Sequence, residues 1–142
     1  ANNSGSAYIF IRDGTSWSQQ AKLVAGDAAA NDYFGYSVSI SGDYALVGSY
    51  YDDDGGSNSG SAYTFVRSGT SWSQQAKLVA GDAAANDYFG RSVSISGDYA
   101  LVGAFYDDDG GSASGSAYIF VRDGTSWSQQ AKLVADDAAA GD

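Results

Sequence analysis

The sequence contains no cysteine, histidine, glutamate, proline or methionine. Without cysteine it forms neither disulfides nor thiolate metal sites, and without histidine it lacks the commonest general base and metal ligand. Most familiar catalytic constellations are therefore excluded. All 17 acidic residues are aspartates, and with 7 basic residues they give a formal charge of −10. Because this charge repels phosphate backbones, we expect no nucleic-acid partner. No stretch is apolar for long enough to suggest membrane insertion.

The composition favours a folded all-β chain. Apolar residues make up 44% of the sequence and aromatic residues 14%, which is enough to build a buried core. Aspartate, serine and 19 glycines favour turns, whereas glutamate, a helix former, is absent. The balance therefore favours strands joined by turns.

An internal repeat dominates the sequence. The motif Ser-Gly-Ser-Ala-Tyr begins at Ser4, Ser59 and Ser114, a constant step of 55 residues. Residues 4–58 and 59–113 differ at only seven positions, and a third copy runs to Asp142. The chain therefore holds about two and a half nearly identical units.

Each unit contains four short segments with the period-two alternation of β-strands. In the first copy they cover residues 34–41, 44–48, 6–12 and 17–24. The segment 6–12 is apolar on both faces, so it belongs inside a sheet that packs between neighbours. The segment 17–24 is the most polar, which predicts a position at the sheet edge.

The order of motifs in the unit carries a family resemblance. Residues 33–38 (Tyr-Phe-Gly-Tyr-Ser-Val), 45–49 (Ala-Leu-Val-Gly-Ser) and 60–65 (Gly-Ser-Ala-Tyr-Thr-Phe) resemble the FG-GAP repeat of integrin α-subunit propellers and of many bacterial surface or secreted proteins. The motifs recur at 89–90, 101–104 and 115–118. The resemblance implies β-propeller blades of four antiparallel strands and an extracellular or cell-surface location.

The predicted organisation is a partial propeller. We expect a half blade at residues 4–30 and complete blades at 31–85 and 86–142. Closed propellers use about four to eight blades, so this number cannot close a ring. We therefore expect the chain to associate with copies of itself or to belong to a longer array.

Calcium is the one cofactor that the resemblance suggests. In many blades of the FG-GAP repeat, which this unit resembles, an aspartate-rich loop between the first two strands binds calcium. Here that loop is only Ser41-Gly42-Asp43, or Ser96-Gly97-Asp98, and a single carboxylate does not supply the six to eight oxygens that calcium needs. We predict no metal there. The remaining candidates are two acidic clusters, which are alternatively interpreted as solvated turns. They comprise Asp52, Asp53 and Asp54, and Asp107, Asp108 and Asp109.

Two sets of residues are candidate ligand contacts. Trp17, Trp72 and Trp127 either stack on sugars or anchor one blade against the next. Tyr36 and Arg91 occupy the same position of the unit, one of the few that vary. This variation indicates either an exposed site or neutral drift.

These observations predict a non-enzymatic repeat scaffold for extracellular adhesion or self-assembly. The alternative is a ligand-binding module, lectin-like or calcium-binding, with glycan or protein ligands. A glycosidase with paired aspartates is the enzymatic alternative, but no apolar pocket is evident that would raise an aspartate pKa for acid catalysis.

Overall fold

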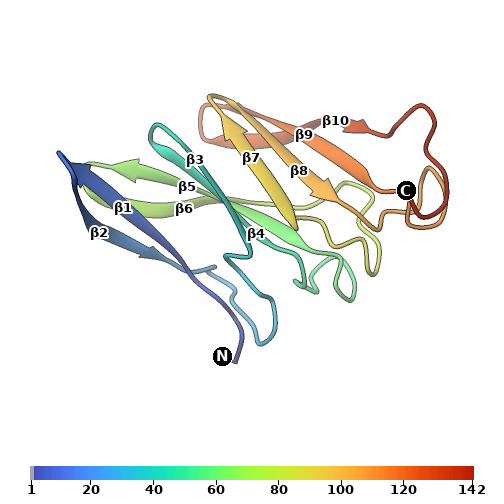
Figure 1. Cartoon of the computed structure of the whole chain (residues 1–142), viewed down its shortest axis with the longest axis horizontal. Coiled ribbons are helices and arrows are strands. Elements are labelled where there is room, and N and C mark those ends of the chain that lie inside the picture. The colour runs from blue at the N-terminus through green and yellow to red at the C-terminus, as the bar shows by residue number, and fades with distance from the viewer. Residues whose placement is uncertain (1) are drawn as a thin grey trace.

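The computed structural model describes residues 2–142 as ten strands in three separate sheets (Figure 1). No helix that could span a membrane occurs in this part of the chain. The strands are β1 (Ala7–Asp13), β2 (Ser16–Leu23), β3 (Ser37–Ser41), β4 (Tyr44–Ser49), β5 (Ser61–Ser68), β6 (Ser71–Leu78), β7 (Ser92–Ser96), β8 (Tyr99–Ala104), β9 (Ser116–Asp123) and β10 (Ser126–Leu133).

The sheets follow the order of the chain. Strands β1 and β2 form a two-stranded sheet, the half blade; β3 to β6 form the second blade and β7 to β10 the third blade. All neighbours are antiparallel, which confirms the all-β fold of four-stranded blades. The polar strands β2, β6 and β10 lie at sheet edges, as their composition predicts. The exact unit boundaries stay predictions.

The core lies between the sheets. One cluster joins the half blade to the second blade and includes Phe34 and Tyr63, whose rings meet edge to face at 5.5 Å. Its counterpart joins the second and third blades, where Phe89 meets Tyr118 at 5.4 Å. Edge-to-face contact suits the ring quadrupoles. The apolar core is therefore formed by contacts between successive sheets.

The first strand of each complete blade is shorter than predicted. It begins at Ser37 rather than Phe34, because Phe34 forms an isolated bridge with Gly5 of the preceding unit. Gly35 has φ +91°, and a Cβ there would lie 2.4 Å from the Ser6 carbonyl oxygen. Only glycine tolerates both conditions. The Phe-Gly dipeptide therefore marks a close approach of two units rather than part of a strand.

A β-bulge, which the alternation pattern did not predict, interrupts each polar edge strand. In β2 the pairing passes from Ala21 to Gln19 and leaves Gln20 as the extra residue. Bulges redirect side chains. The same irregularity leaves Gln75 extra in β6 and Gln130 extra in β10.

Candidate functional site

A lysine-centred cluster lies where the β4–β5 loop meets the loop from the preceding sheet. Lys77 Nζ, from the edge strand β6, lies 2.7 Å from Asp27 Oδ2, 3.0 Å from Asp52 Oδ2 and 2.5 Å from Asp54 Oδ2. The Tyr63 hydroxyl is 3.0 Å from Asp27 and 2.9 Å from Asp52. The third blade repeats this cluster with Lys132, Tyr118, Asp82, Asp107 and Asp109.

The interpretation of the acidic loops as solvated turns is wrong for Asp52 and for its equivalent Asp107. Asp52 is only 3% exposed, and its Oδ1 accepts hydrogen bonds from Ser61 Oγ at 2.8 Å and from the Asp54 amide at 3.1 Å. A buried carboxylate needs such partners. The sequence alone did not reveal them, because serine and lysine are contributed by strands β5 and β6.

The charges in this cluster stabilise one another. Burial by itself would raise the pKa of Asp27, but the hydrogen bonds from Lys77 and Tyr63 outweigh it and hold that pKa below its usual value. Burial by itself would lower the pKa of Lys77, but hydrogen bonds to its aspartate partners outweigh burial and raise that pKa well above the usual range. The ammonium group is therefore charged at every physiological pH.

The cluster has the oxygen atoms of a metal site but already contains a cation. Carboxylate oxygens of Asp27, Asp52 and Asp54 lie within 4.8 Å of one another, a set that a hard cation prefers. The ammonium of Lys77 contacts all three. Sequence reasoning missed Asp27 because it lies 50 residues from Lys77. The recurrence of Ala-Gly-Asp after the edge strand was the available signal.

The other predicted aspartates have local structural roles. Asp53 Oδ1 accepts a hydrogen bond from the Asn58 amide at 2.7 Å, which closes the loop; Asp108 does the same for Ala113. Asp43, in the first-to-second-strand turn, pairs with Arg67. Its equivalent Asp98 pairs with Arg122.

The tryptophans fall into two groups. Trp72 Nε1 donates a hydrogen bond to Gln20 Oε1 at 2.8 Å, and Trp127 Nε1 donates to Gln75 Oε1 at the same distance. These two residues anchor one sheet against the preceding one, and the bulge glutamine is the acceptor. Trp17 is exposed.

Tyr36 and Arg91, which the sequence singled out as one varying position of successive units, lie together. The Arg91 Cζ atom is 5.4 Å from the centroid of the Tyr36 ring, 5.5 Å from that of Tyr50 and 4.5 Å from that of Phe105. These distances permit cation–π attraction. Further rings surround them and complete what we call the aromatic surface, which comprises Tyr33, Tyr36, Tyr50, Tyr51, Tyr88, Phe105 and Tyr106 around Arg91.

The aromatic surface is built by loops that precede β3 and β7 and follow β4 and β8. Tyr88 adopts φ +56°, a left-handed conformation uncommon for an aromatic residue. A hollow of about 440 Å³ lies beside it. The lining residues are Tyr50, Tyr51, Asn86, Tyr88, Arg91, Phe105 and Tyr106.

The fold and the repeated contacts define a propeller-type repeat module. The family model of the FG-GAP repeat matches residues 17–65 and 72–120, more than half of the chain. The chain therefore belongs to the FG-GAP repeat family, which confirms the resemblance. Each matched segment starts in the edge strand of one sheet and ends in the third strand of the next. No curated protein matches the chain.

Proposed function

We propose that the chain is a non-enzymatic extracellular scaffold whose blades add to further blades, for adhesion or for self-assembly with its own copies. The observation that carries the proposal is a contact set that recurs between successive sheets. Between the half blade and the second blade, Trp72 bonds Gln20 at 2.8 Å and Lys77 pairs with Asp27 at 2.7 Å. Between the second and third blades the same contacts recur one unit later.

The next members of this contact set are exposed at both ends of the array. Trp17 and Lys22 correspond to Trp72 and Lys77, and Lys22 has no carboxylate partner within residues 2–142. At the other end, Gln130 and Asp137 correspond to the acceptor residues of the set. An indole N–H at one end thus complements an amide oxygen at the other, and an ammonium complements a carboxylate.

Enzymatic chemistry has little support from the described residues. In each carboxylate cluster the three aspartates contact a lysine that is held in the charged state. A general acid needs instead a carboxyl whose pKa lies near the working pH. We therefore propose a role in binding rather than catalysis.

Sedimentation velocity over a concentration series tests the end-to-end association. Lys22→Asp and Asp137→Lys should each weaken self-association, because like charges then face each other at the contact. An equimolar mixture of the two variants should restore it, since each contact again joins opposite charges.

Matched controls are Arg12→Asp and Asp123→Lys, which make the same charge changes at exposed residues near the ends of β1 and β9. These controls should associate like the unaltered chain. A monodisperse 14.6 kDa species at high micromolar concentration would contradict the proposal of self-assembly.

The aromatic surface favours a second candidate function, the binding of a glycan. The Arg91 guanidinium forms no hydrogen bond or ion pair within residues 2–142, whereas Arg67 and Arg122 pair with aspartates. Its donors remain available to a sugar hydroxyl or carboxylate beside stacking rings. Glycan-array screening of the unaltered chain and Arg91→Ala tests this function, with Arg12→Ala as control. Binding that survives Arg91→Ala would contradict it.

A further inference from the structure

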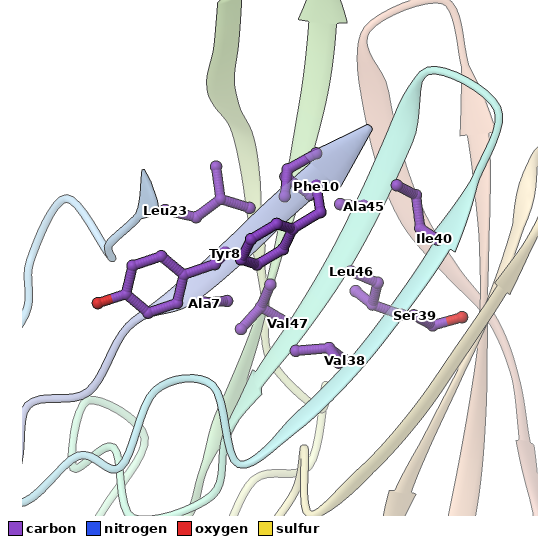
Figure 2. Close-up of a pocket in the computed structure, with 11 residues that line it drawn as sticks. Ala7, Tyr8, Phe10, Leu23, Val38, Ser39, Ile40, Ala45, Leu46 and Val47 are labelled. Carbon is purple, nitrogen blue, oxygen red and sulfur yellow. The ribbon is translucent and has the colours of Figure 1, made fainter. Parts of the chain in front are cut away.

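The half blade leaves one strand edge open. In the complete blades, β5 and β9 lie between an edge strand and a hairpin, which is β3–β4 or β7–β8. Strand β1 has nearly the same sequence as β5 and β9 but pairs only with β2. Beside it lies a groove of about 230 Å³ between β1 and the β3–β4 hairpin (Figure 2).

Both walls of the groove are surfaces that the chain covers elsewhere. On the β1 wall, Phe10 is 52% exposed, whereas its equivalent Phe65 is 3% exposed. On the opposite wall, Ile40 is 57% exposed, whereas its equivalent Ile95 is 6% exposed. In the second blade the hairpin β3–β4 pairs with β5, which places Ala45 opposite Phe65, and it packs against β7. The half blade and Phe34 complete the cover of the Phe65 ring.

We infer that this groove is a binding site for a β-hairpin with the sequence pattern of residues 37–49, supplied by another polypeptide. The internal pairing defines its register. Because Leu46 lies opposite Thr64 and Gly48 opposite Ala62, the same positions of the bound hairpin lie opposite Ile9 and Ala7. Backbone pairing with an open edge provides affinity, and alternate side chains provide specificity.

Three serines of the hairpin define part of that specificity. Across the second and third blades, Ser37 Oγ donates to the Gly90 carbonyl at 2.7 Å. Ser39 Oγ accepts from the Ile95 amide at 3.1 Å, and Ser41 Oγ accepts from the Gly97 amide at 3.2 Å. The equivalent backbone groups beside the groove belong to Gly35, Ile40 and Gly42.

A glycine and a tyrosine add two further requirements. A Cβ on Gly48 would lie 1.9 Å from the Gly90 carbonyl oxygen, so only glycine fits against the next blade. The Tyr44 ring lies 4.3 Å from the Arg122 guanidinium, whose side chain is 19% exposed. Arg67 is the equivalent arginine of the second blade, and its side chain is 40% exposed. A bound hairpin would place its tyrosine on Arg67.

This site is distinct from the end contacts of Trp17 and Lys22. It uses the inner strand β1 and the hairpin β3–β4, whereas those contacts use the outer strand β2. The hairpin site therefore stands even if the chain does not assemble end to end.

The first experiment adds a synthetic peptide of residues 36–50 to the full chain. Hydrogen exchange of residues 7–13, read by mass spectrometry, should slow on binding, because the amides on the open edge of β1 become hydrogen-bonded. The Gly48→Ala peptide should bind at least about tenfold more weakly, and Tyr44→Ala should bind more weakly than the original. A scrambled peptide is the control for nonspecific adsorption.

A second variant removes the dependence on peptide folding. Residues 31–55, repeated ahead of residue 1, supply the hairpin within the same chain. This extension should raise Tm and protect residues 7–13 from exchange, and Gly48→Ala within the added copy should abolish both effects. The proposal is overturned if neither peptide nor extension protects β1, or if the Gly48→Ala forms act as well as the originals.

Discussion

The half blade and the second blade have nearly the same strand sequences and different environments. Phe10 and Tyr8 of β1 are exposed, whereas their equivalents Phe65 and Tyr63 of β5 are buried. Tyr63 and Phe65 pack against the half blade and Phe34 and lie beside the paired hairpin, whereas β1 has neither a preceding sheet nor a hairpin beside it within residues 2–142. Burial in this molecule is therefore a property of the neighbouring blade, and identical residues stabilise the fold by very different amounts.

Truncation of one equivalent phenylalanine in each region tests this comparison most strongly. Phe65→Ala should lower the free energy of unfolding by about 4 kcal/mol, because it leaves a cavity in a packed core. Phe10→Ala should cost less than about 1 kcal/mol, since that ring is largely in water already. Urea denaturation measures both. Equal losses would show that the β1 surface is covered in solution.

Substitutions at two equivalent glycines distinguish the effect of contact with a following blade from the effect of local backbone geometry. Gly48→Ala should destabilise the chain by about 3 kcal/mol, because the new methyl group overlaps the Gly90 carbonyl of the third blade. A Cβ on Gly103 would closely approach only the Ser92 hydroxyl, which can rotate away. Gly103→Ala should therefore cost about 1 kcal/mol. Thermal melting curves compare them. A larger loss for Gly103→Ala would contradict the packing described.

The lysine clusters give a third comparison. Lys77→Met should destabilise the chain by about 2 kcal/mol, because it leaves the buried Asp52 carboxylate without its ammonium. Lys22→Met should have little effect, since Lys22 has no ion pair within the described residues. Urea midpoints at neutral pH distinguish the two. A similar cost for both would mean that Lys77 contributes through its stem alone.

Acid should act on the complete clusters with a definite sign. Asp27, Asp82 and Asp107 have pKa values lowered in the fold, so the stability they add is present above the unfolded value of 3.8 and is lost as pH falls below it. Burial raises the pKa of Asp32 and Asp87, whose protonation partly opposes the loss. We expect stability to fall modestly below about pH 4. Urea midpoints between neutral and acid pH measure it, and a rise on acidification would contradict the lysine clusters.

Calcium should have the smallest effect. Millimolar calcium should leave Tm almost unchanged, because an ammonium already lies among each set of three carboxylates. A site at about a hundredfold excess of ligand over Kd would add about 2.7 kcal/mol and raise Tm by several degrees. Scans with calcium and with chelator measure it. Any response should be larger in Lys77→Met.

The sequence predicted the parts of this molecule that repeat locally. Period-two alternation identified the strands. The polarity of the segment 17–24 predicted its position at a sheet edge. It did not predict the bulge at Gln20, because a bulge preserves composition and changes only register. It also missed the Lys77 cluster, whose partners come from three separate segments.

The near-identity of β1 and β5 has a consequence for how the chain folds. During folding, the β3–β4 hairpin meets two strands of almost the same sequence, and pairing with β1 instead of β5 satisfies its backbone nearly as well. Such a product leaves β5 paired with β6 alone, and its correction requires the β1–β4 hydrogen bonds already formed to break. We expect slow refolding phases from this off-by-one-repeat pairing. Dilution will not remove them, because the competing strands belong to one chain.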